Sequence, residues 1–257
     1  MSSLKIVTSL HEGGWAGYDG VSPGVSAYWT QCVWYKHASQ TYDSDILKTD
    51  FNGQYAAPRV TNADNYLRLN VAGTYYKSDG TASTASTDGQ LLSVGTWYHI
   101  ALVINASAQA RVDLYMCPEG SSTYTLVGFR NVGGSSTSPT YFSVGDITGN
   151  NNSALGLYAH CRIWWAATNA GSLSTTQLND EKDSADVVLT TNNQIAWKLP
   201  GLGQTDDTVD DSGNGYTLTY VSPTTKVSYD AEDAPVGGGG ASFQSAWAKG
   251  SNVIIKG

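Results

Sequence analysis

The sequence predicts an all-β protein, a two-sheet antiparallel sandwich with one short helix. Only 14% of the 257 residues are charged, whereas glycine, serine, threonine and aromatic residues are plentiful, and this composition favours strands and turns over solvated helices. Short segments of alternating apolar and polar residues are bounded by glycine-rich or asparagine-rich turns. Because one sandwich commonly takes roughly 200–250 residues, and no internal linker divides the chain, we expect a single domain over residues 1–236.

The clearest element is a hairpin over residues 95–117, around which the other strands are expected to be arranged. Its first half carries Trp97 and the apolar run 100–104, and its second half alternates apolar with polar residues from Arg111 to Met116. Residues 105–109 form a short polar connection between the two halves. Two β-rich runs joined in this way predict an antiparallel hairpin whose apolar faces need a second sheet to cover them.

The other expected strands follow in chain order. They span residues 4–10, 26–38, 46–51, 59–60, 66–71, 124–130, 141–144 and 155–166. Strand 26–38 has bulky residues on both faces, which predicts a central strand covered on both sides. Residues 78–89 contain few apolar side chains and predict a long exposed loop or a ragged edge strand.

One helix is predicted, about two turns long and starting at Thr175. Ser174 and Gln177 have the spacing of a capping box, in which each side chain bonds the other residue's backbone N–H. Leu173 and Leu178 are placed where a hydrophobic staple would fix the entry of the chain into the helix.

Three motifs resemble those of the laminin-G-like and concanavalin A-like jelly rolls. They are the hairpin GTWYHIALV with RVDLY, the aromatic strand ending in RIWW with the following SLSTTQL, and the W-x-L and D-S-G-N-G elements within 195–215. The resemblance covers roughly residues 4–222 and implies a two-sheet jelly roll. It also brings glycan binding and glycoside hydrolysis into consideration, since proteins of this fold include lectins and glucanases.

Composition argues against several partners. The net charge is −8 and basic residues do not cluster, which argues against nucleic acid because phosphate binding needs grouped lysines and arginines. The longest strongly apolar run, 100–104, is far too short to cross a bilayer, and residues 1–10 lack the apolar run of a signal peptide, so neither membrane insertion nor export is expected. The odd cysteine count, with Cys32, Cys117 and Cys161 all in expected strands, predicts reduced, buried thiols.

Enzyme chemistry is disfavoured, and no catalytic residue is assigned. The hydrolases of this fold need two carboxylates beside the scissile bond and carry a signature that resembles E-x-D-x-x-E. The four glutamates do not have that spacing: Glu12, Glu119, Glu181 and Glu232. The histidines have no zinc-ligand spacing, and His99 and His160 are interpreted as strand residues with satisfied hydrogen bonds. A glycoside hydrolase is kept as the weaker alternative.

Two loops are predicted to bind glycans, because exposed rings stack on sugars while amides and carboxylates bond hydroxyls. The first is the glycine-dense loop 11–20 and the second the asparagine-rich loop 145–153. The candidate ligand-binding residues are Trp15, Tyr18, Asp146, Asn150, Asn151 and Asn152. The alternative for Trp15 is a place at the end of the core.

No cofactor is assigned, with calcium left open. Asp146 and Asn150 to Asn152 offer the oxygen ligands that Ca²⁺ takes, and Asp210, Asp211 and Asn214 offer a second set. Asp-Ser-Gly-Asn-Gly is equally a turn in which the aspartate and asparagine bond their own backbone and the glycines take positive φ.

The end of the chain is predicted to attach the domain to a partner. Gly237 to Gly240 separate an apolar segment from the rest, and its large side chains would be costly to leave in water. The expected partner-binding residues are Phe243, Trp247, Val253, Ile254 and Ile255. They are expected to pack on a neighbouring subunit or particle protein, and the alternative is the protein's own sheet.

These features predict a non-enzymatic structural or recognition protein. An acidic jelly roll without a signal peptide and with an apolar tail looks like the decoration or fibre-type surface proteins of bacteriophage virions, an analogy of fold and general character. That resemblance implies a homo-oligomer that contacts other virion proteins, is made in the host cytoplasm and located on the virion, with glycans as further ligands. The alternative is a free lectin-like carbohydrate-binding module.

Overall fold

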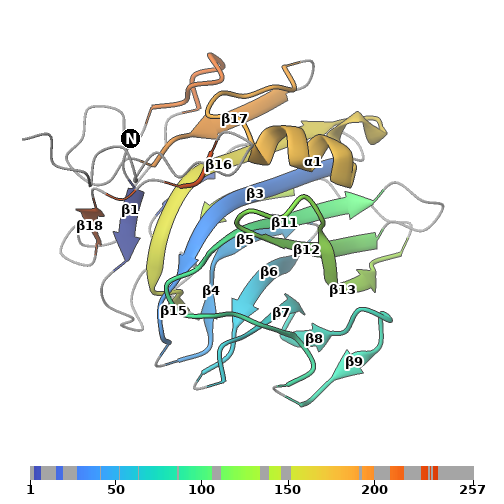
Figure 1. Ribbon diagram of the computed structural model, residues 1–257. Helices are drawn as coiled ribbons and strands as arrows, with labels where there is room; N and C mark the ends of the chain where they lie inside the picture. Colours follow the sequence, from blue (N-terminus) through green and yellow to red (C-terminus); the bar gives the residue numbers. More distant parts are fainter. Residues whose placement is uncertain are drawn as a thin grey trace, which may run out of the picture.

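The protein is a β-sandwich in the computed structural model (Figure 1). The structure describes residues 3–6, 16–19, 28–40, 42–51, 53–62, 64–85, 87–105, 111–133, 139–145, 152–190, 193–199, 209–216, 227–230, 232 and 234–236. Within these residues there are two stacked sheets, one α-helix, α1 (Thr175–Lys182), and a short 3-10 helix, η1 (Asn169–Gly171). The predicted all-β sandwich with one short helix is confirmed.

The first sheet, called sheet 1, has antiparallel pairing throughout its described strands. Its order is β13 (Thr125–Asn131), β12 (Arg111–Pro118), β11 (Trp97–Asn105), β3 (Tyr28–His37), β16 (Gly156–Ala166), β1 (Ser3–Ile6) and β18 (Val227–Asp230), with β17 (Asn193–Trp197) also on β16. The predicted hairpin is β11 with β12, in which Leu102 is opposite Leu114.

The second sheet, called sheet 2, is antiparallel except for one short parallel pairing of β4 with β15. Its described strands run in the order β2 (Ala16–Asp19), β14 (Pro139–Val144), β5 (Leu47–Phe51), β6 (Gln54–Val60), β7 (Tyr66–Val71), β8 (Thr74–Tyr76) and β9 (Ala82–Ser83). Beside this path, β10 (Gln90–Leu91) pairs with β7, and β4 (Ser44–Asp45) pairs with β6 and β15 (Asn152–Ser153). The chain passes from β3 in sheet 1 to sheet 2, back for β11 to β13, across for β14 and back for β16, which is the crossing pattern of a jelly roll.

The main core fills the space between the sheets. Trp29 of β3 packs against Phe51 and Phe142 of sheet 2, with ring centroids 5.8 and 6.0 Å apart, and all three side chains are buried. The alternation along each strand sends these residues inward and their neighbours outward. The outward residues therefore decide what each sheet presents.

The outer face of sheet 1 is covered by α1 and the segment before it (Figure 1). Leu173 and Leu178, the two residues of the predicted hydrophobic staple, belong to one buried cluster with Cys32 and Trp164, and this cluster covers the second face of β3. The capping box between Ser174 and Gln177 is present as predicted. The three cysteines are buried free thiols, also as predicted.

Candidate functional site

The two loops predicted to bind glycans lie largely outside the described residues. Trp15, Asp146, Asn150 and Asn151 lie outside the described residues, as does the whole segment 237–257 with its predicted partner-binding residues. Tyr18 and Asn152 are in β2 and β15, but only their backbone is described. The loop site and the tail contact stay predictions.

The second proposed calcium set is a turn. Asp210 accepts hydrogen bonds from the backbone N–H groups of Ala196 and Ser212 through Oδ1 and of Tyr216 through Oδ2. Gly213 and Gly215 take φ of 80° and 79°, the conformation that favours glycine. The described residues contain no group of three or more histidine, cysteine, aspartate or glutamate side chains placed to hold a metal ion. The hydrogen bonds of Asp210 and the positive φ of the two glycines are those of the turn interpretation.

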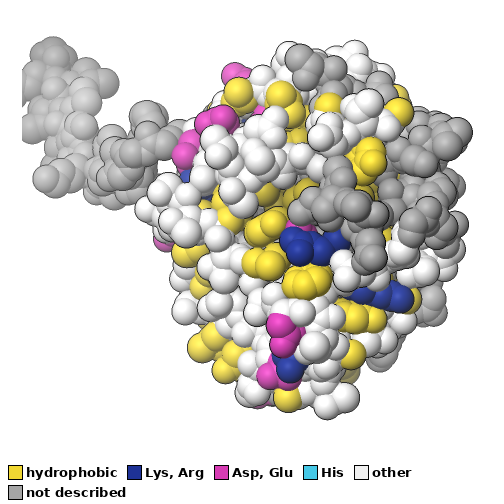
Figure 2. Space-filling view, turned by 90° about the vertical axis from the view of Figure 1, so that its right-hand side faces the viewer, with side chains coloured by type: hydrophobic (Ala, Val, Ile, Leu, Met, Phe, Trp, Pro, Cys, Tyr) yellow, Lys and Arg dark blue, Asp and Glu magenta, His cyan; other side chains and the backbone are white. Residues whose placement is uncertain are grey.

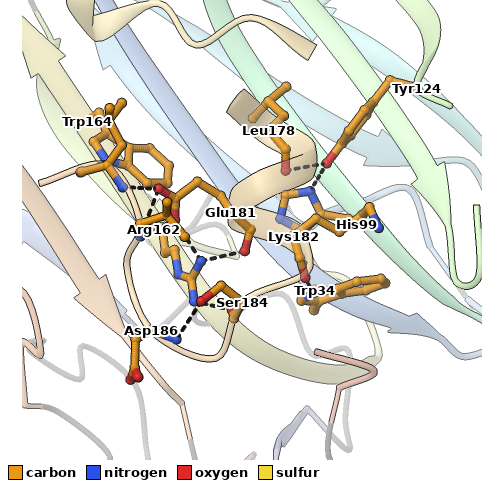
Figure 3. Close-up of polar contacts among 12 residues, drawn as sticks. Trp34, His99, Tyr124, Arg162, Trp164, Leu178, Glu181, Lys182, Ser184 and Asp186 are labelled. Carbon is orange, nitrogen blue, oxygen red and sulfur yellow. Dashed lines mark hydrogen bonds and ion pairs between the residues drawn. The ribbon is translucent and has the colours of Figure 1, made fainter. Parts of the chain in front are cut away.

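A buried polar network lies between α1 and sheet 1 (Figure 3). Arg162 of β16 donates to Glu181 Oε2 at 2.8 Å and to the Ser184 carbonyl at 2.7 Å, with the side chains of the ion pair 4% and 1% exposed. Glu181 also accepts from the backbone N–H groups of Val188 and Leu189. This carboxylate is thus used to tie the segment after α1 to the sheet.

His99 is the titratable centre of the other half of this network (Figure 3). Its Nδ1 is 2.5 Å from Tyr124 Oη, and Tyr124 donates to the Leu178 carbonyl of α1 at 3.2 Å. The pKa of His99 is lowered well below its ordinary value. Burial is the largest cause, and the positive charges of Arg162 and Lys182 add to it. The imidazole ring is therefore neutral near pH 7. Through Tyr124 it connects β11 to α1.

A pH-dependent stability follows from His99. Because its pKa is lower in the folded than in the unfolded state, the unfolded chain binds more protons below pH 6.5, and stability falls as the pH falls through that value. Between pH 7.5 and 5.5 the wild type should lose about 1.4 kcal/mol more unfolding free energy than His99→Gln. Urea unfolding of both proteins at the two pH values measures this difference. Equal losses of unfolding free energy in the two proteins would show that His99 does not cause this pH dependence.

A different part of the molecule, the outer face of sheet 2, brings polar and aromatic side chains together, most of the polar ones buried. The register places Asp45, Arg59 and Arg68 in one row across β4, β6 and β7. The next row crosses β6 to β9 with Ala57, Asn70, Tyr75 and Ser83. A third row crosses β14, β5 and β6 with Tyr141, Asp50 and Tyr55. Their inward neighbours, such as Leu69 and Phe51, belong to the core.

Tyrosine rings on this face are half-buried and held in place. The Arg68 guanidinium lies 3.8 Å from the ring centroid of Tyr75, and Tyr75 Oη donates to Asp43 Oδ2 at 2.8 Å. Lys48 Nζ is 4.7 Å from the ring centroid of Tyr55. Burial raises the pKa of Tyr75 to about 12, so its hydroxyl stays a hydrogen-bond donor at neutral pH. Rings fixed in this way lose little freedom when a ligand stacks on them.

The strongest charges of this face are paired with each other. Arg59 donates to both oxygens of Asp45, at 2.6 and 2.9 Å, and the side chains are 9% and 0% exposed. Burial, the largest single influence, lowers the pKa of Arg59, but the charge and hydrogen bond of Asp45 together with those of Tyr75 outweigh it and raise the pKa above its ordinary value. The pair compensates its own charge and does not require a charged ligand.

Two buried donors on the same face have no hydrogen-bond partner in the described part of the chain. They are Asn70 Nδ2, in a residue that is 1% exposed, and Arg68 Nε, in a residue that is 3% exposed. The other groups of these residues are engaged, since Asn70 Oδ1 accepts from the Gly73 N–H and Arg68 Nη2 donates to Ser83. Buried donors without partners are rare and costly, by about 1–3 kcal/mol each, which marks places where a ligand or water acceptor belongs.

The described basic side chains are dispersed on the side of the sandwich where β13 and β9 lie. Figure 2 shows them there as a few groups among hydrophobic and acidic side chains. Two arginines of sheet 1 stack on rings, Arg111 4.3 Å from the centroid of Phe129 and Arg130 5.3 Å from that of Tyr76. In the described residues, no helix has the length and apolar character needed to cross a membrane.

The comparisons with known proteins find only distant structural likeness. No family model and no curated protein matches the chain. The SAP-like pentraxin from Limulus polyphemus is 15% identical over 76% of this chain and 91% of that one, with a TM-score of 0.45. The CBM40 of Ruminococcus gnavus IT-sialidase, bound to α2,3-sialyllactose, is 15% identical over 69% and 96%, with a TM-score of 0.39.

A third solved structure is tailspike protein 2 from Escherichia coli O157:H7 bacteriophage CAB120. It is 12% identical over 59% of this chain and 21% of that one, with a TM-score of 0.39. Likeness at these TM-scores carries no weight for ligand or assembly. The class of fold rests on the strand pairing above.

Proposed function

We propose that this protein is a non-enzymatic recognition protein that binds neutral glycans on the outer face of sheet 2. The observation that carries the proposal is that half-buried tyrosines lie beside a buried amide donor without a partner in the described residues, all on one face. Sugars present apolar ring faces for stacking and hydroxyls for hydrogen bonds, so this combination of groups matches them.

Each part of the face has a role in this proposal. Tyr55 and Tyr75 supply ring surfaces, and Asn70 Nδ2 and Arg68 Nε donate to hydroxyl oxygens. Because Asp45 and Arg59 neutralise each other, a neutral glycan fits better than an anionic one.

The sequence-based hypothesis of a bacteriophage surface protein extends this proposal and stays a prediction. Its supports are the acidic composition and the apolar segment 237–257, whose residues lie outside the described part of the chain. The free carbohydrate-binding module, the alternative weighed from the sequence, would use the same face of sheet 2.

A glycan array tests the proposal, with variants chosen on both faces of the sandwich. Asn70→Asp keeps the acceptor for the Gly73 N–H and removes the unpartnered donor, while Tyr55→Ala removes a ring. We expect each change to weaken binding about tenfold or more, the effect of one good hydrogen bond or ring contact. Tyr115→Ala, a half-buried tyrosine on β12 of sheet 1, is the matched control and should bind like the wild type.

The array is run in calcium and again in EDTA, which also tests the calcium alternative. Absence of binding to any glycan in both buffers would overturn the proposal. Equal binding by the wild type, Asn70→Asp and Tyr55→Ala would show that glycans do not bind at this face. Release of reducing ends from a bound polysaccharide, abolished by changing one carboxylate, would contradict the non-enzymatic part.

A further inference from the structure

A cavity of about 250 Å³ lies on the outer face of sheet 1, the side of the sandwich away from the proposed glycan face. Its wall is formed by β16, β17, the segment that follows α1 and the Asp210 turn. Its inner residues, Arg162, Gln194 and Ala196, are 3–5% exposed, whereas Asp186, Thr190 and Asp211 at its rim are exposed. It therefore has a buried interior and a mouth that reaches solvent.

A bulge in β16 brings His160 to this wall. Between Ala159 and Arg162 the pairing with β3 advances three residues on β16 and two on β3, from Trp34 to Cys32. Tyr158 and Cys161 both belong to the main core, so the extra residue leaves Ala159 and His160 together on the outer face. His160 takes φ of 50°, an unusual conformation for a residue with a side chain.

Strain of this kind collects at functional sites, where the rest of the fold holds it in place. Here the His160 N–H donates to the Lys198 carbonyl at 3.0 Å, which fixes the bulge against the strand end of β17. The bulge thus adds a ring to the cavity that a regular strand would turn into the core.

One buried polar atom of the cavity wall has no hydrogen-bond partner among the described residues. Gln194 Oε1 is buried and accepts no hydrogen bond from the described residues, and Gln194 itself is 5% exposed and lines the cavity. An amide oxygen in this state requires a donor.

The charges of the cavity wall are largely matched within the protein. Lys198 Nζ is 3.5 Å from Asp211 Oδ2, and Arg162 is held by Glu181 and the Ser184 carbonyl, as Figure 3 shows. The wall therefore offers donors and acceptors side by side without a strong net charge. A hydroxyl group, which both donates and accepts, is the group that fits such a lining.

We propose that this cavity is a second binding site, which takes one small neutral polyhydroxylated molecule, a monosaccharide or a polyol, with a ligand hydroxyl donating to Gln194 Oε1. Its volume lies below the roughly 300–1,000 Å³ of pockets that enclose drug-sized ligands, which limits the ligand to about one sugar ring. The site goes beyond the glycan face of sheet 2, shares no residue with it and does not depend on it.

Saturation-transfer NMR and calorimetry with D-glucose, D-galactose, myo-inositol and D-glucuronate test the proposal on the full-length protein. At least one of the neutral probes is expected to bind the wild type. Gln194→Leu should weaken that binding about tenfold, the effect of losing one buried hydrogen bond. Gln90→Leu, the same change at a half-buried glutamine of sheet 2, should leave it unchanged.

A second variant tests the same site in case Gln194→Leu does not fold. Thr190 is exposed at the rim, so Thr190→Trp should fold normally while narrowing the mouth and weakening binding. Failure of all three neutral probes to bind would mean that the cavity holds water only and would overturn the proposal. Equal binding by wild type and Thr190→Trp, or tenfold tighter binding of D-glucuronate than of D-glucose, would also overturn it.

The two sites are separable by the same measurements. Asn70→Asp should leave monosaccharide binding in the cavity intact, and Gln194→Leu should leave the glycan-array pattern intact. A change in both assays from either variant would contradict two independent sites.

Discussion

Glu181→Ala is expected to lower the free energy of unfolding by about 3–5 kcal/mol, because it leaves the Arg162 guanidinium buried without its counter-charge. The same change removes the acceptor of the Val188 and Leu189 N–H groups, so the segment after α1 loses its attachment to sheet 1. Arg162 keeps only carbonyl partners, Glu181 and Ser184. Urea unfolding followed by tryptophan fluorescence measures the loss.

Two further variants separate the ion pair from general effects. Glu119→Ala removes an exposed glutamate and should change the unfolding free energy by less than about 0.5 kcal/mol. Replacing both partners, with Arg162→Leu and Glu181→Leu together, should cost less than Glu181→Ala alone, since no buried charge is then unpaired. A loss below about 1 kcal/mol for Glu181→Ala would show that the pair does not hold this segment.

Asp45→Asn is expected to cost a similar amount, about 3–5 kcal/mol, on the other side of the molecule. Arg59 would remain charged and buried in the row that it shares with Arg68, with an amide in place of its bidentate partner. Because the pair also orders the face that we propose to bind glycans, binding should weaken even at temperatures where the variant is fully folded.

Asp180→Asn, an exposed change on α1, is the matched control and should alter neither stability nor binding. Unfolding free energies and array signals are measured for both variants. If Asp45→Asn were as stable as Asp180→Asn, the Asp45–Arg59 pair would not order this face.

The parts of the fold that the sequence predicted are those fixed by local patterns. The alternation in 111–116 sets the faces of β12, and the spacing of Ser174 and Gln177 sets the start of α1. A turn was one of the two interpretations of Asp-Ser-Gly-Asn-Gly, and the structure has this turn. It could be predicted because its hydrogen bonds and positive φ angles involve only Asp210 and residues close to it in sequence.

The candidate sites were missed because they depend on register between strands distant in sequence. Tyr55 and Tyr75 are on different strands, and only the pairing of β6 with β7 and β8 brings their rows together. One signal was present in the sequence: in 66–71 the apolar residues alternate with Tyr66, Arg68 and Asn70, a polar and aromatic outer face. Alternation alone does not show whether such a face is exposed or covered, whereas glycine-rich loops are exposed by their composition.

The bulge at His160 was missed for a different reason. One extra residue in β16 reverses the alternation halfway along the strand, and no local pattern marks the position. The bulge is recognised only from the pairing of β16 with its two neighbouring strands, β3 and β17.

The most direct test of glycan recognition on sheet 2 is a titration of ¹⁵N-labelled protein with the glycan that gives the strongest array signal, followed by ¹H–¹⁵N NMR. The side-chain NH₂ of Asn70 is visible in these spectra and reports the proposed contact itself. We expect it to shift together with backbone amides of β6, β7 and β8, and to do so with the affinity measured by calorimetry. An unmoved Asn70 side chain, with the shifts confined to sheet 1 or its cavity, would contradict recognition by the outer face of sheet 2.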